Sequence, residues 1–236
     1  IDVTDPYNPF EIDRINGSNS IWRDLKYWDR YVYIGTEADD GIKIVSVDNL
    51  DNPQLVNTIT DIDNSHNIHI DADGYLYIVG ADNNDIWIYS LMSPSNPALV
   101  GTWNLQDGQS STSGYCHDIE VYNDKIYCAS IYTGYFHIID VSDKSNPYTL
   151  VSHNTLGGEV STHDCAVTFD EQYLITGDET AGGHIKVWDI SNYDNINLVS
   201  EYYTPEWETH TAHNLYIQEN NPNMLIISYY ADGTRF

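Results

Sequence analysis

Basic side chains are scarce in this sequence. Nine Lys and Arg residues stand against 36 Asp and Glu residues, which gives a formal net charge of −27 over 236 residues. Proteins that bind nucleic acid or anionic membranes need positive patches, so this composition argues against both classes of partner. A solvated acidic surface suits salty or divalent-rich surroundings, where counterions screen the repulsion between carboxylates.

Long apolar runs are also missing. No stretch approaches the length of a membrane-spanning helix. The opening residues, IDVTDPYNPF, have the pattern of folded sequence, so we expect no signal peptide here. The cysteines, Cys116, Cys128 and Cys165, are an odd set that cannot form a complete disulfide framework. We expect them to be buried thiols.

Aromatic residues, in contrast, are abundant. The chain has 20 Tyr and 6 Trp, and 41% of its residues are hydrophobic, which excludes a disordered composition. Aromatic and β-branched residues favour strands, and no segment has the pattern of a long amphipathic helix. A chain of this length can bury a substantial core.

The sequence repeats itself. Similar segments begin near residues 21, 65, 116, 162 and 212, for example SHNIHIDADGYLYIVGADNNDIWIYSL and CHDIEVYNDKIYCASIYTGYFHIIDV. A second, shorter segment, which we call the tail, follows each of the first four; DNLDNPQLV and MSPSNPALV are examples. The first residues of the chain, VTDPYNPFEI, resemble a tail without the longer segment that precedes the others. One position aligns across all five segments, at separations of 43, 51, 46 and 50 residues: Arg23, His66, His117, His163 and His213.

Periods of this size, with several short strands in each, are typical of β-propeller blades. We therefore predict an all-β fold of four-stranded antiparallel blades. The five units form either a closed five-bladed propeller or part of a six- to seven-bladed one. We predict a single propeller domain over 1–236, with a tail at 1–15, units at about 16–59, 60–104, 109–154 and 156–203, and a partial unit at 205–236.

The third unit shows the expected pattern of one blade. Two-residue hairpin turns are predicted at Asn123-Asp124 and, in the second unit, at Asp73-Gly74. The strands of the third unit are predicted at about His117–Tyr122, Lys125–Ser130, Tyr135–Val141 and Tyr148–Ser152.

Proline marks the next boundary. It removes a ladder donor and keeps its predecessor extended, so Asn-Pro pairs are expected just before the outermost strands. The pairs are Asn52-Pro53, Asn96-Pro97 and Asn146-Pro147.

The two ends of the chain resemble two parts of one strand and its tail. Joining Phe236 to Ile1 gives GTRFIDVTDPYNP, which matches GIKIVSVDNLDNP in length and phase. Because this junction falls inside a strand, we expect the chain to be an excerpt of a longer propeller.

Several motifs follow one another in a characteristic order over essentially the whole chain. They are WRDLKYWDRYVYIGTEA, HNIHID, CHDIEV, DVSDKSNP, THDCAV with YLITGDE, VWDIS, and HNLYI with YYADGTRF. This order resembles the LVIVD-repeat propellers, in particular the secreted bacterial group called choice-of-anchor B. The resemblance implies an extracellular or surface-anchored protein with further propeller sequence on both sides, and it supplies no established activity.

The recurring histidines are the first candidate site. Innermost strands of all blades converge on a propeller axis, so one position per blade becomes a ring of side chains. Imidazoles suit Zn, Cu, Fe or Ni, and carboxylates at the ends of second strands could add ligands. Arg23 holds the same position in the first unit, where it would repel a cation, which argues for an asymmetric site or none. The candidate ligands are His66, His117, His163, His213, Glu37, Asp178 and Glu179.

The same residues also fit a structural role, which we favour. His117, Ile119 and Val121 share one strand face, so the histidine continues an apolar face that packs on the neighbouring blade. Polar neighbours of the histidines are expected to hold the start of each strand through bonds to the backbone. A buried His–Asp network stabilises WD40 propellers in a comparable way. The residues predicted to line the axis are Arg23, Asp24, Asn67, Asp118, Asp164 and Asn214.

Other patterns are weaker. DADG at 71–74 resembles half of a calcium loop, but it lacks the downstream Glu, so a turn is the better interpretation. GHIKVWDIS at 183–191 resembles a WD40 signature in one unit only. Aromatic residues expected to be exposed in loops would suit contact with sugar or protein: Tyr132, Tyr202, Tyr203 and Trp207.

We therefore predict an extracellular or cell-surface binding or scaffold module for a protein, a glycan or a cation, and we lean against an enzyme. The first alternative is a metalloenzyme with a His-ligated metal on the propeller axis. The second is an architectural subunit of a surface assembly. The cofactor would be a divalent metal, Zn, Cu, Fe or Ca. Neither a nucleic-acid partner nor a transmembrane segment is expected.

Overall fold

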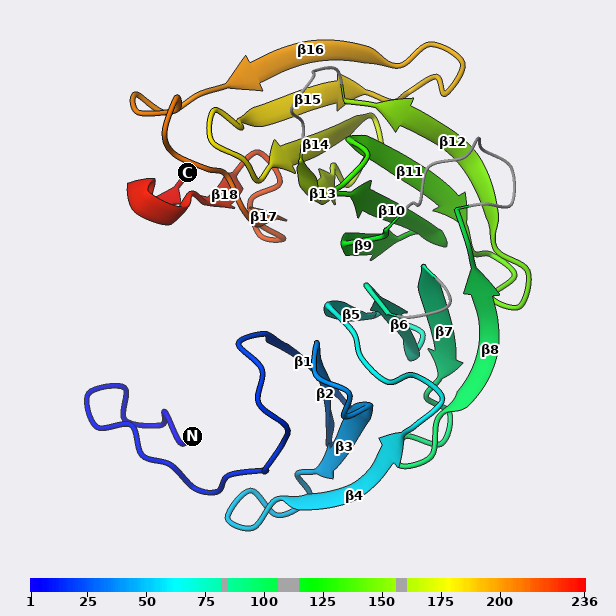
Figure 1. The fold of residues 1–236 in the computed structure, drawn as a ribbon, viewed down its shortest axis with the longest axis vertical. Helices are drawn as coiled ribbons and strands as arrows, with labels where there is room; N and C mark the ends of the chain where they lie inside the picture. The colour runs from blue at the N-terminus through cyan, green and yellow to red at the C-terminus, as the bar shows by residue number, and fades with distance from the viewer. Residues whose placement is uncertain (82–84, 106–114, 156–160) are drawn as a thin grey trace. The chain divides into compact units, whose positions relative to one another are not determined.

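The computed structural model describes residues 1–81, 85–105, 115–155 and 161–236. In these ranges the chain is all-β, with five antiparallel sheets and one short 3₁₀ helix. Within the same ranges, no helix has the length and apolar character that a membrane crossing requires. The chain divides into two compact units, Ile1–Val100 and Gly101–Phe236, which are described separately (Figure 1).

Unit 1 carries two sheets of four strands, and the strands of each pair in chain order. The last strand of the second sheet continues past Val100 into the first residues of unit 2. The first sheet contains β1 (Arg23–Trp28), β2 (Tyr31–Thr36), β3 (Ile42–Ser46) and β4 (Gln54–Ile59). The second contains β5 (Asn67–Ile70), β6 (Tyr75–Val79), β7 (Ile86–Ser90) and β8 (Ala98–Trp103).

Unit 2 carries the other three sheets, again in chain order. The third sheet contains β9 (Asp118–Tyr122), β10 (Lys125–Ser130), β11 (Tyr135–Asp140) and β12 (Tyr148–Asn154). The fourth contains β13 (Thr162–Val167), β14 (Tyr173–Asp178), β15 (Ile185–Asp189) and β16 (Asn197–Tyr202). The fifth has three strands, β17 (Leu215–Ile217), β18 (Leu225–Ser228) and β19 (Thr234–Arg235), with the 3₁₀ helix η1 (Tyr230–Asp232) before the last.

The four strands predicted for the third unit are confirmed to within two residues. The first hairpin turn is also confirmed: Asn123 and Asp124 have φ of 46° and 56°, as a two-residue turn of the mirror-image type requires. The second hairpin prediction is wrong in its length. Asp71 N–H donates to the Tyr75 carbonyl, which leaves a three-residue loop that ends on Gly74 at φ 78°.

Gly74 is needed for a second reason. A Cβ at this position would lie 2.7 Å from the ring of Trp28, so the Trp28 side chain leaves no room for one. Asp71 holds the loop, because its carboxylate accepts the Tyr75 amide at 2.9 Å and the Tyr77 hydroxyl at 2.7 Å. The DADG stretch therefore functions as a hairpin turn.

The Asn-Pro pairs lie where the sequence predicts. Each proline directly precedes an outermost strand, so that β4, β8 and β12 begin at the next residue. The first, third and fourth sheets also share a shift of register between their third and fourth strands. A proline boundary and a bulge at matching places indicate that the repeat extends to the outer edge of the sheet.

The sheets pack face to face through apolar side chains. In unit 1, Ile42 and Ile44 of the first sheet pack with Ile68 and Trp87 of the second. In unit 2, one core joins the third and fourth sheets and a second joins the fourth and fifth. Four-stranded antiparallel sheets that stack in this way are β-propeller blades. The predicted fold class is confirmed.

Aspartates in the innermost strands bond adjacent sheets to each other. Asp24 accepts the Ile68 amide of the second sheet at 3.1 Å, and Asp164 accepts the Leu215 amide of the fifth sheet at 2.7 Å. The other oxygen of each carboxylate accepts the amide of the next residue in its own strand. These two residues bond the backbone near the starts of their own strands, and they also connect neighbouring blades.

Candidate metal centre

The five aligned residues occupy one structural position, the start of the innermost strand of each sheet. Arg23 opens β1 opposite Thr36, and His163 is the second residue of β13. His66 and His117 directly precede the inner strand, and His213 lies two residues before it. The amides of these three histidines donate at 2.8–2.9 Å to the second strand, in the pairs His66–Val79, His117–Ala129 and His213–Ser228.

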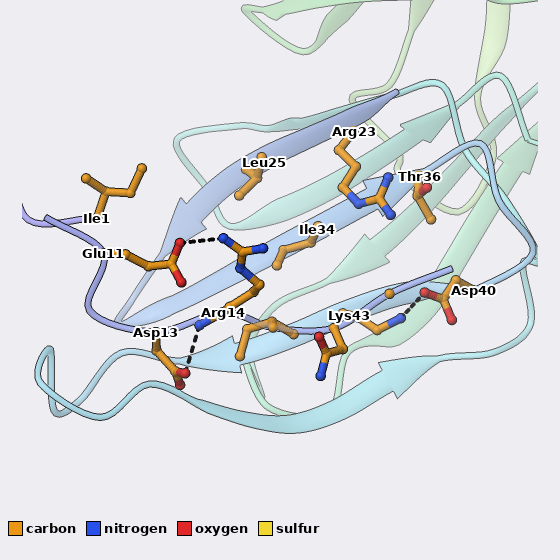
Figure 2. Close-up of a pocket in the computed structure, with 14 residues that line it drawn as sticks. Ile1, Glu11, Asp13, Arg14, Arg23, Leu25, Ile34, Thr36, Asp40 and Lys43 are labelled. Carbon is orange, nitrogen blue, oxygen red and sulfur yellow. Dashed lines mark hydrogen bonds and ion pairs between the residues drawn. The ribbon is translucent and has the colours of Figure 1, made fainter. Parts of the chain in front are cut away.

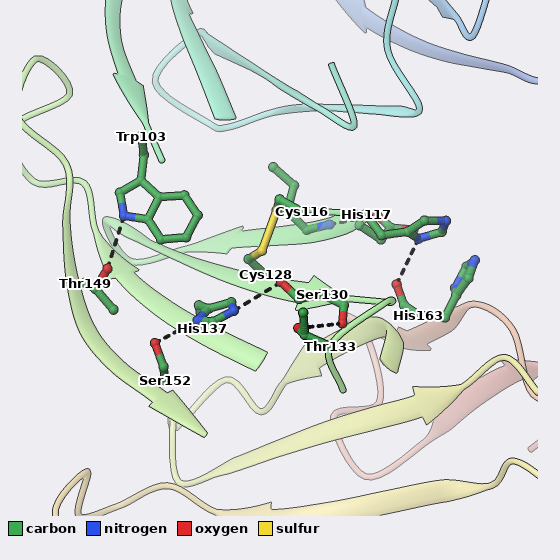
Figure 3. The surroundings of a disulfide bond; sticks show 12 residues. Trp103, Cys116, His117, Cys128, Ser130, Thr133, His137, Thr149, Ser152 and His163 are labelled. Carbon is green, nitrogen blue, oxygen red and sulfur yellow. Dashed lines mark hydrogen bonds between the residues drawn. A yellow bond between two sulfur atoms is a disulfide. The ribbon is translucent and has the colours of Figure 1, made fainter. Parts of the chain in front are cut away.

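In unit 2 three histidines stand in a row. The ring centroid of His163 lies 4.3 Å from that of His117 and 4.0 Å from that of His213. His117 donates from Nδ1 to the backbone carbonyl of His163 at 3.3 Å, as the dashed line in Figure 3 shows. The central ring, His163, is 1% exposed. One imidazole from each of three successive sheets therefore converges within unit 2.

Glu179 is the carboxylate that meets this row. It directly follows β14, and its amide donates to the Ser161 carbonyl at 2.7 Å. Its Oε2 lies 3.5 Å from Nε2 of His163, and its Oε1 lies 3.6 Å from Nε2 of His213. The Tyr230 hydroxyl donates to Oε1 at 2.5 Å, and the Tyr230 ring stands edge-on to His213. One carboxylate thus faces two imidazole nitrogens.

The side chain of Asn214 determines which nitrogen of His213 carries the proton. Its amide oxygen contacts Nδ1 of His213, and an oxygen of this kind only accepts, so Nδ1 donates. In the neutral ring the lone pair is then on Nε2, the atom that faces Glu179. A lone pair that faces a carboxylate oxygen is repelled by it, and a proton or a metal ion between the two atoms would replace that repulsion with attraction.

The donor set fits a transition metal. Two imidazoles and one carboxylate are a known zinc ligand set, with ligand bonds of about 2.0–2.2 Å and thus donors about 3.4 Å apart in a tetrahedron. The ligand atoms of His163, Glu179 and His213 all lie within 4.8 Å of one another. Calcium prefers six or more oxygen ligands, so this set does not favour it.

The other predicted carboxylate of unit 2, Asp178, has a different partner. Its Oδ2 accepts Lys186 Nζ at 2.7 Å, and both side chains are almost fully buried. Lys186 also donates to the Thr155 carbonyl at 2.9 Å. Asp178 and Glu179 are adjacent on an extended chain, so their side chains point to opposite faces. Asp178 therefore neutralises a buried lysine.

In unit 1 the corresponding residues form a smaller group. Nδ1 of His66 lies 2.7 Å from Oε1 of Glu37, and the His66 ring stacks on Trp22 at 4.8 Å. The Arg23 guanidinium turns to backbone carbonyls instead, including that of Ser18 at 2.5 Å. Unit 1 thus brings together one imidazole and one carboxylate. Of the remaining predicted axis residues, Asn67 opens β5, and Asn214 donates to Asp118 at 3.3 Å in unit 2.

A cavity of about 330 Å³ lies beside Arg23 in unit 1 (Figure 2). Three cationic side chains line it, and each has a partner within the unit. Arg14 pairs with Glu11 at 2.6 Å, Lys43 pairs with Asp40, and Arg23 bonds the carbonyls described above. Carboxylates thus neutralise two of these cationic groups, and backbone carbonyls hold the donors of the third.

The cysteine prediction is wrong for two of the three residues. Cys116 and Cys128 form a disulfide, with their Cα atoms 6.0 Å apart (Figure 3). Cys116 lies just before β9, and Cys128 lies on the paired strand β10, so the hairpin brings them together. Cys165 is a buried free thiol, as predicted, and burial raises the pKa of that thiol.

A Ser–His contact lies near the disulfide, and the sequence did not indicate it. Nε2 of His137 is 3.1 Å from Oγ of Ser130, and Nδ1 is 2.7 Å from Oγ of Ser152. Burial lowers the pKa of His137 to about 4, which keeps the ring neutral. Both His137 and Ser130 are buried. The group therefore satisfies polar atoms inside the third sheet, away from any substrate.

Sequence reasoning also missed Tyr230. It belongs to η1, an element that the fifth sheet carries between its second and third strands, so no repeat pattern pointed to it. The four aromatic residues predicted to be exposed, in contrast, are exposed. They are Tyr132, Tyr202, Tyr203 and Trp207.

No protein-family model matches this chain, and no curated protein sequence matches it. Solved structures do match. A periplasmic gluconolactonase of Pseudomonas aeruginosa, PpgL, is 10% identical, with a TM-score of 0.70 over 92% of this chain. A 6-phosphogluconolactonase-like protein of Bacteroides uniformis is 11% identical, with a TM-score of 0.62 over 85%. The computationally designed protein Ika8 is 16% identical, with a TM-score of 0.57 over 89%.

The fold is a β-propeller. At these identities the likeness shows the fold alone, so the lactonase names describe those proteins and not this one. The chain spans 67%, 61% and 56% of the lengths of the three matched structures, respectively.

Proposed function

We propose that this chain is a binding module of an extracellular or cell-surface bacterial protein, and that unit 2 binds a divalent transition-metal cation. The ligands are Nε2 of His163, Nε2 of His213 and the carboxylate of Glu179. The observation that carries the proposal is the position of Glu179, whose two oxygens lie 3.5 and 3.6 Å from these nitrogens. A single cation between the three groups would compensate the carboxylate and use both lone pairs.

The surroundings of the ligands support this proposal. His163 lies between two other imidazoles, and Asn214 orients His213 from the far side of its ring. Outer contacts of this kind fix the tautomer and the ring angle of a ligand, which raises metal affinity. Tyr230 donates to the carboxylate of Glu179 from the side that stays accessible, since 25% of the Glu179 side chain is exposed.

The proposed location has separate support. The order of motifs resembles the choice-of-anchor B group of LVIVD-repeat propellers, whose members are secreted or anchored at the surface. The disulfide between Cys116 and Cys128 is a bond that persists in oxidising compartments. The large negative charge suits surroundings rich in divalent cations, where it would raise their local concentration near the protein.

Metal content of the purified chain tests the proposal. Protein stripped with chelator and titrated with Zn²⁺ by calorimetry is expected to bind one equivalent in unit 2. Glu179→Gln keeps the shape of the side chain and removes its charge, so it should weaken binding about 100-fold. His213→Gln should weaken it by a similar factor. Thermal unfolding of each apo variant shows whether the fold is intact.

His66→Gln is the matched control. It removes an imidazole of unit 1 that also has a carboxylate partner, Glu37. The control should leave one equivalent bound at unchanged affinity. Zn²⁺ binding that disappears in His66→Gln, or that survives in Glu179→Gln, would contradict the three-ligand site.

The metalloenzyme alternative has one specific observation in its favour. Three protein ligands leave the fourth tetrahedral position open to water or substrate, as in catalytic zinc sites. The names of two structural neighbours select δ-gluconolactone as the first substrate to assay. Metal-dependent hydrolysis that is lost in Glu179→Gln would establish an enzyme, whereas stoichiometric metal without turnover would leave a binding module.

A further inference from the structure

A second surface site lies in unit 2, beyond the end of β16. It is built by Tyr203, Trp207, His184 and Glu201, and we call it the aromatic corner. The ring centroids of Tyr203 and Trp207 lie 5.1 Å apart at an angle of 70°. His184, just before β15, stacks on Tyr203 at 4.1 Å. The corner therefore presents two large rings at close to a right angle.

The placement of Trp207 is unusual for this chain. All six tryptophans lie in the described ranges, and Trp207, which is 37% exposed, is the most exposed of them. Trp103 and Trp188 are buried, and their indole N–H groups donate to Thr149 and Thr176. Tyr203 is exposed to a similar extent as Trp207. Exposed Trp and Tyr in contact are common at binding surfaces, because each ring offers a large contact area at low entropic cost.

The corner is held in place before any ligand arrives. Nε2 of His184 lies 2.8 Å from Oε1 of Glu201, and the Tyr203 hydroxyl donates to the same oxygen at 3.2 Å. The amide of Trp207 donates to the Thr204 carbonyl at 3.2 Å, which closes the turn that carries the indole. Rings that are already ordered lose less entropy on binding.

The electrostatic surroundings of the corner are negative. The hydrogen bond from His184, and then that from Tyr203, lowers the pKa of Glu201, so this carboxylate is ionised at neutral pH. Glu206 and Glu208 flank Trp207 and are exposed. The nearby lysine, Lys186, is buried and paired with Asp178. The faces of aromatic rings are themselves negative, so rings and carboxylates attract the same kind of ligand.

We infer that the aromatic corner binds an organic cation of the quaternary ammonium type. Such a cation is attracted to the faces of Trp and Tyr within about 6 Å and needs no hydrogen-bond acceptor. That property matters here, because two donors already occupy Oε1 of Glu201. The acidic surroundings exclude anionic sugars and acidic peptides. This inference concerns different residues from the metal site and does not depend on it.

Choline is the probe. Titration of the intact chain, followed through the N-methyl proton signal of choline, should show saturable binding with a dissociation constant on the order of 1–10 mM. 3,3-Dimethyl-1-butanol has the same shape without the charge, so it should bind at least about tenfold more weakly. Chelator is present throughout, which keeps the measurement independent of bound metal.

Variants assign the binding to the corner. Trp207→Leu removes the ring at an exposed position and should weaken choline binding at least about fivefold. Glu201→Gln should weaken it about threefold, and added salt should reduce that difference. Tyr7→Leu is the control, because it removes a highly exposed aromatic ring in unit 1 by the same kind of replacement. The control should bind choline like the unmodified chain.

Four results would overturn the inference: no saturable binding of choline, equal binding of the uncharged analogue, unchanged binding in Trp207→Leu, or equal loss in Tyr7→Leu. Cellohexaose is titrated in parallel. Binding of this neutral sugar at the corner, with none of choline, would identify a glycan site and would also refute the proposal. Matching circular dichroism spectra of the variants exclude unfolding as the cause of a loss.

Discussion

The first and fourth sheets share a sequence pattern and differ in the chemistry that it produces. YVYIGTE at 31–37 and YLITGDE at 173–179 both end on a glutamate that faces a histidine of the next sheet in the chain. Glu37 meets one imidazole, whereas Glu179 meets two. The difference lies in the residue that begins the innermost strand of the same sheet. In the first sheet it is an arginine that turns to backbone carbonyls, and in the fourth it is His163.

A second contrast concerns the lysine in the third strand of each sheet. Lys43 in β3 pairs with Asp40 near the surface, where the two side chains are 13% and 23% exposed. Lys186 in β15 pairs with Asp178, and these side chains are 4% and 3% exposed. The same position in the repeat thus carries a solvated ion pair in unit 1 and a desolvated one in unit 2. Loss of one charge from this ion pair should therefore reduce stability more in unit 2 than in unit 1.

Removing the acidic partner of each lysine should give the largest difference. Asp178→Asn leaves the Lys186 ammonium buried without its counter-charge, so we expect the free energy of unfolding to fall by about 3–5 kcal/mol. Asp40→Asn affects a pair that water screens, and its effect should stay below about 1 kcal/mol. Urea denaturation of the two variants measures both. Equal losses would show that burial does not distinguish the pairs.

The arginine of unit 1 can be transferred to unit 2. His163→Arg replaces the central imidazole with the residue that occupies its position in the first sheet. We expect Zn²⁺ affinity to fall at least about 100-fold, which corresponds to about 2.7 kcal/mol, because one ligand is lost and a positive charge is added. Calorimetric titration measures the change. His163→Gln separates the two contributions, since it removes the ligand without adding charge. Retained affinity in His163→Arg would assign the metal to other residues.

The sequence determines the propeller well because the repeat is redundant. Alternating residues, hairpin turns and Asn-Pro pairs recur in several units, so one misjudged feature does not change the outcome. The Asp73-Gly74 turn was predicted one residue too short, yet the strands on both sides are unaffected. The same redundancy reveals the histidines, because aligning the repeat units places them at one shared position.

The details of the site depend on contacts that no repeat encodes. Asp178 and Glu179 look alike as candidate ligands, and only the pairing of Asp178 with Lys186 separates them. Tyr230 reaches Glu179 from an element of the fifth sheet that lies 51 residues further along the chain. Cys116 and Cys128 are joined because one precedes a strand and the other lies on its neighbour. Each of these contacts requires the three-dimensional register.

A smaller effect distinguishes the units by pH. Burial raises the pKa of Glu120 to about 7, although the Val167 amide, which donates to it at 2.6 Å, opposes the shift. The corresponding position in unit 1 holds a partly exposed lysine, Lys26. Because the folded state holds this proton more tightly than the unfolded chain, Glu120 should reduce stability as pH rises from about 4.5 to 7, by about 2 kcal/mol.

Glu120→Gln should remove that dependence and keep the bond from Val167. Unfolding free energies of the two proteins are compared at several pH values. Asp164 titrates in the same range, because burial and the nearby Glu120 charge raise its pKa to about 7. The difference between the two proteins therefore reports Glu120 together with its effect on Asp164. Buried His69, whose pKa is lowered to about 4, contributes the same opposite slope to both proteins and cancels. A difference that does not vary between pH 4.5 and 7 would mean that Glu120 is ionised in the folded protein throughout this range.

The reverse exchange tests the role of the residue at the strand start most directly, and its expected effect is the smallest. Arg23→His gives unit 1 two imidazoles beside Glu37, so at high Zn²⁺ concentration we expect a second equivalent to bind. Its affinity should be lower than that of unit 2, because His66 faces Glu37 through Nδ1, whereas His213 faces Glu179 through Nε2 and Tyr230 donates to the same carboxylate. Arg23→Gln is the control and should bind one equivalent. If Arg23→His also binds one, the residue at the strand start is insufficient, and the metal site requires the additional support that Asn214 and Tyr230 give in unit 2.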